Sequence, residues 1–596
     1  MKKIINKVAT KETGRIFLVL LASFLTVYRI ILQLKLPPVT FAGGGVDEHV
    51  FVMQATEILK GNWFGDYNSN TLVKNPMYSF FYIFVNKIGV AYPFALIMFY
   101  IFSIIVLICA LSPVMRSTLF RFFAYIFLLY SPVMLDKKFG FRLYRDALLT
   151  PLIVLLVASL IALFLYRNRS KYLLIAWSIL AGVSFFSFTY LREDSIWLKP
   201  LFYVALAITF FFILFGKERV LEKVIKMGSL LIPIAIFFGL TMALSHQNEE
   251  KYGIYAVNDH TQTHFQNVIA DLIAIDDGTN QEYIWVHRTA LRSAMEVSPT
   301  LRKLEEQFDS FYVPNSTLMV KIDGEKQQEM FSGKVVWLLR LAVERAGVGY
   351  QQELVVNGKK ELGGKVTDNF YKAIHEELMA GFNDGRLKKR SGGISVSKSA
   401  PAKKIEDIKK NVLPKILYTA QETALYRSYF VTEDNRAVSG DVMATREIEM
   451  LINSPLNYPV SSEQAQYNKS IGGVVKRINR IISLYKITSI PVIILSIIGF
   501  VSSIINLKRQ GYNDKHFLIV LVSIGLVLSY FILLLGVSWA YSWVSGDTMN
   551  RLYFYSSGAI PILQIIYILC FGALFEALGR RSQMMGKHQK TERVSE

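Results

Sequence analysis

The sequence predicts an all-α protein that crosses a membrane about ten times. Three observations predict this fold class: 52% of the 596 residues are hydrophobic, only 19% are charged, and apolar runs recur along the chain. A helix needs about 20 such residues to cross the hydrocarbon core of a bilayer. The third predicted span is the shortest. The predicted spans are 16–34, 90–111, 119–135, 147–166, 172–190, 196–215, 227–245, 486–506, 517–536 and 556–577.

Basic residues predict how the chain sits in the membrane. The first apolar run is too long for a signal-peptide core and lacks a small-residue cleavage site, so we expect it to remain as a span. If ten spans alternate, both tails and the Lys- and Arg-rich short loops share one face, which marks that face as cytoplasmic. This bias explains most of the +20 net charge. A nucleic-acid partner is therefore not needed to account for the charge, and we expect none.

The chain divides into three predicted parts. Residues 1–245 form a membrane module of seven spans, and residues 486–596 hold three spans and a basic cytoplasmic tail. Residues 246–485 are polar and fall on the extracytoplasmic side, between the seventh and eighth spans, as a mainly helical or α+β domain. Both cysteines lie in spans, so no disulfide framework supports that domain. Its helical patterns lie at 283–294, 335–346, 370–382 and 414–429.

Composition also suggests where the protein resides. The abundance of Ile, Lys, Phe, Tyr and Asn is typical of an AT-rich bacterial genome. We therefore expect a multi-pass protein of a bacterial plasma membrane, with cytoplasmic termini and the lipid bilayer as its surroundings.

An acidic pair, Asp47 and Glu48, follows the first span directly. Carboxylates at a membrane edge are costly, and they usually have a partner, a metal ion, a proton or a substrate. The three glycines at 43–45 let the chain turn sharply ahead of the pair. The first outer loop, 35–89, is therefore where we expect chemistry.

Other charged residues fall near the outer ends of the predicted spans. Short loops between packed helices would hold them close together on one face. Arginine forks bind phosphate oxygens and a carboxylate accepts a proton from a hydroxyl, so a cavity lined by both suits a substrate with a phosphate and a sugar. These residues are Lys74, Arg142, Arg145, Asp146, Arg192, Glu193, Asp194 and Arg551.

Each of these residues also has a purely structural interpretation. Asp47 or Glu48 could pair with a basic loop residue. The charged runs at 142–146 and 192–194 could be local salt-bridge clusters that orient the spans after them. Lys74 could be a solvated loop lysine, and Arg551 could reach toward lipid headgroups.

Three short stretches carry a resemblance to a known family. Residues 46–63 place an acidic residue after the first span, then an amphipathic helix, then Gly61-x-Trp63. Residues 72–78 contain Lys74-Asn75-Pro76, similar to a Lys-Pro-rich turn, and residues 550–555 form an Arg-x-x-x-Tyr segment. This pattern resembles the GT-C superfamily of multi-spanning glycosyltransferases, close to the protein O-mannosyltransferases and the lipid A aminoarabinose transferases. Asn75 stands where the family turn often has a first proline.

The resemblance implies a GT-C-like fold and an inverting transfer reaction. The donor would be a polyprenyl-phosphate-linked sugar, and the acceptor a cell-envelope polymer, lipid or protein on the outer face. Asp47 would be the general base, with Glu48 as its neighbour in the catalytic pair. Lys74, Arg142, Arg145, Arg192 and Arg551 would bind the donor phosphate, while Asp146, Glu193 and Asp194 would orient the acceptor. A cofactor is not required, although Mg²⁺ or Mn²⁺ would suit oxygen ligands.

Two other functions remain open. A transporter or flippase of lipid-linked glycans would place charged or broken segments at the membrane midplane. A non-enzymatic envelope scaffold would not need Asp47. Separately, His260 and His264 have the i, i+4 spacing of a helical metal pair, but solvated or acceptor-contacting histidines fit the run better, because it lacks the glutamate of the zinc-protease motif.

Overall fold

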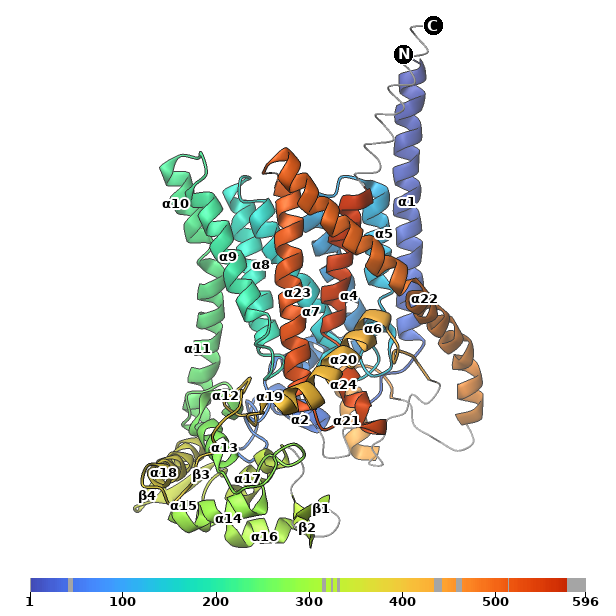
Figure 1. The fold of residues 1–596 in the computed structure, drawn as a ribbon. Coiled ribbons are helices and arrows are strands. Elements are labelled where there is room, and N and C mark those ends of the chain that lie inside the picture. The colour runs from blue at the N-terminus through green and yellow to red at the C-terminus, as the bar shows by residue number, and fades with distance from the viewer. Residues whose placement is uncertain are drawn as a thin grey trace.

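The computed structural model shows a helix bundle with a smaller domain at one end (Figure 1). It is 71% helix and 3% strand. The glycines at 43–45 lie outside the described residues, and so does the basic tail from residue 576. The structure describes residues 2–40, 47–312, 318–322, 325–329, 333–432, 442–456, 464–512 and 514–575.

Seven helices in this part of the chain are long and apolar enough to cross a membrane. An eighth is present if Gly546–Tyr555 and Ala559–Phe575, which meet at a 58° bend, count as one broken span. The chain is therefore a multi-pass membrane protein of the all-α class. The seven are the stretch Glu12–Leu34 of α1 (Lys2–Leu34), α4 (Tyr92–Leu111), α7 (Asp146–Leu165), α8 (Lys171–Thr189), Val220–Tyr252 with α10 (Val220–Ser229) and α11 (Ile232–Tyr252), Ile471–Arg509 within α22 (Gln464–Gln510), and α23 (Asp514–Ala540).

Two of the predicted spans correspond to shorter apolar helices. At 119–135 the chain forms α5 (Thr118–Leu129) and then the separate short helix α6 (Pro132–Leu135). At 196–215 it forms α9 (Lys199–Leu214), which has 16 residues. A helix rises 1.5 Å per residue, so neither α5 nor α9 alone covers about 30 Å of hydrocarbon. The number of ten spans stays a prediction.

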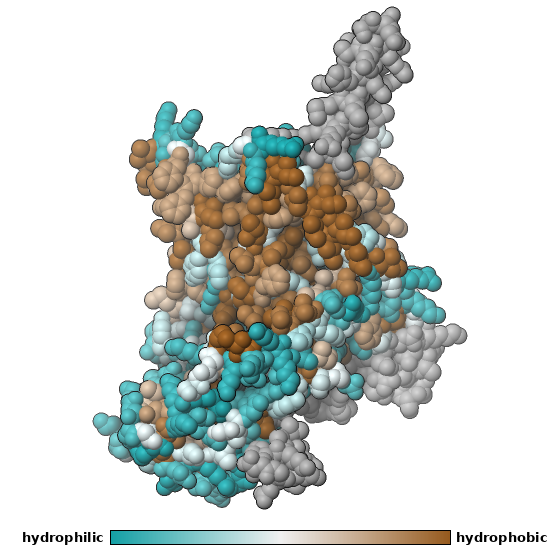
Figure 2. Space-filling view, in the orientation of Figure 1, coloured by the Kyte–Doolittle hydropathy of each residue, from teal (hydrophilic) through white to brown (hydrophobic). Residues whose placement is uncertain are grey.

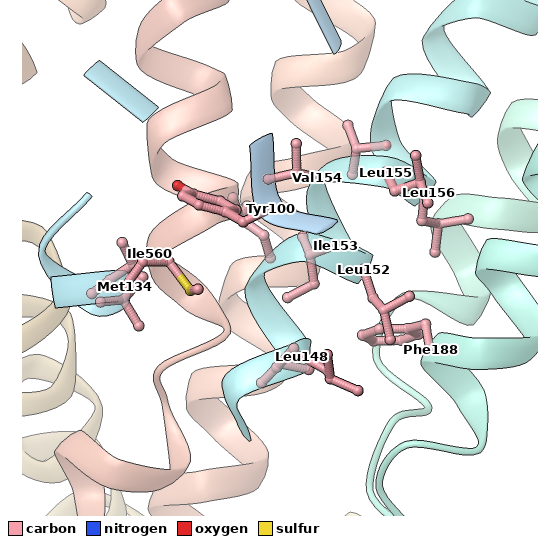
Figure 3. Packing of buried hydrophobic residues seen from close by; sticks show 14 of the residues in the cluster. Tyr100, Met134, Leu148, Leu152, Ile153, Val154, Leu155, Leu156, Phe188 and Ile560 are labelled. Carbon is pink, nitrogen blue, oxygen red and sulfur yellow. The ribbon is translucent and has the colours of Figure 1, made fainter. Parts of the chain in front are cut away.

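Helix α7 is the centre of the bundle. It packs against α4 and α8, and nearly all of its side chains are buried. A helix that is apolar on every face has no side suited to water, so it takes the inner position. Figure 3 shows Leu152 and Ile153 of α7 among side chains from neighbouring elements, including Tyr100 and Phe188. Figure 2 shows hydrophobic residues over the bundle and mainly hydrophilic ones over the outer domain.

The outer domain is mainly helical, with two antiparallel hairpins. The predicted helix at 335–346 is confirmed as α17 (Lys334–Arg345), and the one at 370–382 lies within α18, which already begins at Gly363. The patterns at 283–294 and 414–429 correspond to α14 and α20, whose ends differ from the predicted ones by a few residues. The hairpins are β1 (Leu318–Ile322) with β2 (Glu325–Glu329), and β3 (Glu353–Val356) with β4 (Lys359–Leu362). Its helices are α12 (Asp259–Gln262), α13 (His264–Ala274), α14 (Arg288–Val297), α15 (Pro299–Arg302), α16 (Glu305–Phe311), α17 (Lys334–Arg345) and α18 (Gly363–Asn383). Three further helices follow in the chain: α19 (Ile405–Asp407), α20 (Leu413–Leu425), which packs against α22, α23 and α24 (Asn550–Tyr555), and α21 (Val442–Ile452), which packs against α3 (Met77–Lys87).

The first outer loop belongs to the packing of this domain. It contains α2 (Asp47–Leu59) and α3 (Met77–Lys87). Between these helices, Phe64, Tyr67 and Leu72 are buried in the same hydrophobic core as α13, α17 and α18. In contrast, buried residues after α20, including Tyr429, belong to the core of the bundle. The outer domain therefore contacts the segment that carries Lys74.

The outer domain lies at one end of the bundle, and the first turns of α1 lie at the opposite end together with α10 (Figure 1). Helices α2 and α24 (Asn550–Tyr555) lie where the bundle meets the outer domain. The loops that carry the predicted site residues come together at this junction.

Candidate functional site

Helix α2 places the acidic pair at its own N-terminus. Asp47 and Glu48 form its first turn, where the helix dipole favours negative charge. The two side chains differ in exposure: the Asp47 side chain is 25% exposed, and the Glu48 side chain is 1% exposed. Only the first of the two carboxylates is therefore open to a ligand.

Asp47 is surrounded by donors from two other segments. Its Oδ2 lies 3.0 Å from Lys74 Nζ and 3.8 Å from Arg145 Nη2. The Tyr144 hydroxyl donates a hydrogen bond to the same oxygen, at 2.9 Å. Burial raises the pKa of Asp47, but Lys74 and Arg145 outweigh burial, and the pKa is lowered below its ordinary value. Asp47 is therefore a carboxylate at neutral pH.

Glu48, unlike Asp47, is buried and paired with Arg142. One of its oxygens, Oε1, lies 2.7 Å from both Nε and Nη2 of Arg142, whose guanidinium also stacks over the rings of Tyr144 and Phe554. Its Oε2 is buried without a hydrogen-bond partner among the described residues. Burial raises the pKa of Glu48 against the influence of Arg142. The pair anchors the start of α2 to the loop before α7.

The remaining charged residues pair across loops. Arg145 Nη1 lies 2.6 Å from Glu193 Oε2. Arg192 lies 2.6 Å from Asp146 and 2.6 Å from Asp194. Burial raises the pKa of Glu193, but Arg145 and Lys74 hold it well below its usual range. The local pairing considered for 192–194 is therefore present between Arg192 and Asp194, while Arg145 and Asp146 form ion pairs with the other run.

Asn75 fixes the segment that carries Lys74. Its backbone N–H donates to Glu193 Oε1 at 2.9 Å, and its side-chain oxygen accepts from Asn258 Nδ2 at 2.5 Å. A proline at this position would have no N–H to donate. The departure from the Lys-Pro-rich turn therefore supplies a bond that ties Lys74 to the outer domain and to Glu193.

Ion pairs join nine of the ten predicted residues into three neighbouring groups. Arg551 is not part of these ion pairs: it is exposed, and its guanidinium lies over the ring of Trp543. Its helix still borders the cluster, because Tyr555 of α24 lies beside the Arg192 guanidinium. The groups are Asp47, Lys74, Arg145 and Glu193; Glu48 and Arg142; and Asp146, Arg192 and Asp194.

Three aromatic residues at this site were not predicted. Tyr144 lies between two arginines in sequence, a signal that could have found it. Trp337, under Lys74 Nζ at 5.2 Å from the ring centre, and His260 come from the outer domain, and no local pattern connects them to Lys74. Burial, together with Arg340 and Lys74, lowers the pKa of His260 to about 3, so the imidazole is neutral. His264 instead lies 2.8 Å from Asp368.

The cluster does not fit a divalent cation in this arrangement. Each of its five carboxylates lies against a lysine or arginine. In the described part of the chain, no three His, Cys, Asp or Glu side chains are grouped to hold a metal ion. The geometry defines instead a polar site, at the junction of bundle and outer domain, in which the partly exposed carboxylate of Asp47 lies beside a lysine and an arginine.

These features define the class: a multi-pass helical membrane protein with a charged site at one end of its bundle. No protein-family profile, curated protein or solved structure matches the chain.

Proposed function

We propose that the chain is an inverting membrane glycosyltransferase of the GT-C type. It moves a sugar from a polyprenyl-phosphate donor to a cell-envelope acceptor on the extracytoplasmic face. The observation that carries the proposal is the position of Asp47: a partly exposed carboxylate, 3.0 Å from Lys74 and 3.8 Å from Arg145, where the helix bundle meets the outer domain. A lipid-linked donor reaches that level from the bilayer, and a polar acceptor reaches it from outside.

In the proposed reaction, an acceptor hydroxyl oxygen attacks the anomeric carbon of the donor sugar. The bond between that carbon and the phosphate oxygen breaks, and polyprenyl phosphate leaves with both electrons. The hydroxyl proton passes to Asp47. Lys74 and Arg145 stabilise the charge that develops on the phosphate, which is usually the largest part of such catalysis.

The ion pairs suggest how the donor prepares the base. Lys74 now lies against Asp47, so an incoming phosphate competes with that carboxylate for the ammonium group. Once phosphate neutralises Lys74, the lysine no longer lowers the pKa of Asp47, and burial raises it. Asp47 then becomes a stronger base when the donor is in place.

Glu48, Arg142, Asp146, Arg192, Glu193 and Asp194 act around this centre. Arg192 and Asp146 are almost fully buried together, at 4% and 1% exposure. Glu48 and Arg142 are bonded to each other. We propose that these residues hold Asp47, Lys74 and Arg145 in position, and that Arg551, on the exposed rim, meets the outer part of the donor phosphate.

Substituting Lys74→Met tests the link between lysine and base. Removing the positive charge raises the pKa of Asp47, and the base works only when deprotonated. The acidic limb of the pH profile of kcat/KM, which reports the enzyme before the donor binds, should therefore move to higher pH, and the donor KM should rise. The matched control is Lys360→Met, because Lys360 is 77% exposed on the outer domain. If the acidic limb did not move, Lys74 would not control the pKa of the catalytic base.

The proposal itself is tested with purified protein and with cells. We expect release of polyprenyl phosphate from a polyprenyl-phosphate sugar when envelope material is added, and a changed envelope glycan profile after deletion of the chain. Both changes should be reversed by the wild-type chain. If deletion left every envelope glycan unaltered, the transferase would be rejected.

A further inference from the structure

A polar cavity lies beside α2, separate from the charged cluster. Its volume is about 570 Å³, within the 300–1,000 Å³ typical of small-molecule sites. One wall is α2, with His49 and Gln54 among its residues. A second wall is the loop 61–71, and the outer domain closes the third with Tyr252 and Gln352.

The cavity follows the side of α2 that leads to the proposed base. Asp47, Val50 and Gln54 are spaced i, i+3 and i+7, so they share one face of the helix. The residues of α2 that line the cavity are His49, Val50, Met53, Gln54 and Glu57, so the lining includes two members of this face and ends before Asp47. A molecule that fills the cavity therefore lies beside the face of α2 on which Asp47 is the first residue.

One donor in the cavity wall is left without a partner. The Gln54 side chain is only 3% exposed, and its oxygen accepts from the Ser79 hydroxyl at 2.8 Å. Its Nε2 has no hydrogen-bond partner among the described residues. A buried amide N–H that is unpaired costs about 1–3 kcal/mol, so a ligand oxygen that reached this buried Nε2 through the cavity wall would be stabilised.

The loop 61–71 holds its shape without a ligand. The Thr71 hydroxyl donates to the Asp66 carbonyl at 2.9 Å, and Asn68 accepts from the Asn70 backbone N–H at 2.8 Å. The Tyr252 hydroxyl donates to the Gly65 carbonyl at 2.8 Å. Each of these bonds joins a side chain to a backbone N–H or carbonyl of the loop. The Asn70 side chain is exposed and lines the cavity.

The charges of the lining select the class of ligand. Amide and hydroxyl groups both donate and accept, as sugar hydroxyls require. Glu57, whose pKa is lowered by hydrogen bonds from Lys60 and Asn62, is neutralised by its ion pair with Lys60 at 2.9 Å. The charges of Asp66 and Lys251 oppose each other, so this lining has no surplus of lysine or arginine to favour an anionic ligand.

We infer that this cavity binds an uncharged saccharide, the acceptor whose hydroxyl reaches Asp47. The inference rests on the proposed function for the reaction, but the binding is independent of it. The outer domain contributes directly, because Gln352 donates to the Lys251 carbonyl at 3.2 Å and accepts from the Tyr67 N–H at 2.9 Å. The domain thereby joins the first outer loop in building the site.

The test uses the full chain in nanodiscs on an array of uncharged and anionic oligosaccharides. We expect binding to uncharged members, weakened at least tenfold by Gln54→Leu and by Asn70→Trp, which fills the cavity. Asn168→Trp is the control, since Asn168 is exposed in the loop between α7 and α8.

The outcomes distinguish the saccharide-binding cavity from the proposed transferase function. Binding restricted to anionic glycans, or uncharged binding that Asn70→Trp leaves unchanged, would overturn the inference. Because Asn70 is exposed, a folding defect does not obscure this variant, and thermal unfolding checks Gln54→Leu. If binding follows the cavity but no transfer is found, the transferase fails while the saccharide site stands.

Discussion

Replacing Asp47 with Asn should reduce kcat for glycosyl transfer by about 10²–10⁴-fold, the contribution typical of a general base. The amide matches the carboxylate in size, and its oxygen still accepts from the Tyr144 hydroxyl, now 2.9 Å away. What the amide cannot do is take a proton. Because the Asp47 side chain is 25% exposed, we expect little change in the free energy of unfolding.

The same substitution leaves Lys74 without its carboxylate partner. The free ammonium group should hold a donor phosphate at least as well as before, so the donor KM should stay unchanged or fall. A purely structural ion pair predicts another result: kcat near that of the wild type, with lower stability. The measurements are the initial rate of polyprenyl phosphate release, the donor KM and the unfolding temperature.

Asp384→Asn is the matched control. It makes the same chemical change in a carboxylate that is 47% exposed on the outer domain and paired with Arg386. Its kinetics should equal those of the wild type. Normal transfer by Asp47→Asn at normal abundance would reject Asp47 as the base and would favour a scaffold role.

The membrane helices were predictable because hydropathy is a local property. The runs that became α4, α7, α8 and α23 are apolar almost throughout, and burial in lipid or in the bundle requires only that. Hydropathy does not detect the break after α5, where Pro132 begins a separate short helix after a turn. Hydropathy averages over that turn, so the sequence suggests one longer span.

That these charged residues lie near one another was predictable from the sequence, but which of them form ion pairs was not. A charge that follows a span must lie near the membrane surface, which identified Asp47, Arg145 and Arg192. Their partners depend on how the loops cross. Arg145 bonds to Glu193, 48 positions away, and not to the adjacent Asp146. Sequence distance carries no information about such a choice.

The outer domain shows the same limit more strongly. The helical pattern predicted at 335–346 is confirmed as α17, and its Val335 and Leu339 are buried in the domain core. The polar members of the same helix contact the first outer loop, about 270 positions earlier. Glu344 accepts from Ser69 through the backbone N–H at 3.3 Å and through the hydroxyl at 2.5 Å. Only the folded chain reveals that contact.

Arg340 provides the second large effect. It is fully buried on α17 and donates to the carbonyls of Ser69 and Thr71, each at 2.7 Å. Its third partner is the buried carboxylate of Asp259. Arg340→Leu leaves that charge and two carbonyls unpaired, so the free energy of unfolding of the outer domain should fall by about 3–5 kcal/mol.

The expected loss extends to the proposed reaction. Thr71 lies three residues before Lys74, and Arg340 is what holds the Thr71 carbonyl. Release of that loop should displace Lys74 from Asp47, so transfer should decline even at temperatures where the variant is folded. The readouts are the unfolding temperature, limited proteolysis of the outer domain, and kcat measured below the unfolding transition.

Arg345→Leu is the control on the same helix, because Arg345 is exposed and its guanidinium lies over the ring of Phe311. A second variant separates charge from anchoring. Arg340→Leu combined with Asp259→Leu removes both buried charges, so it should regain part of the lost stability. It cannot restore the bonds to Ser69 and Thr71, so transfer should stay low. Recovery of transfer along with stability would show that the buried charge pair, and not the loop contact, positions Lys74.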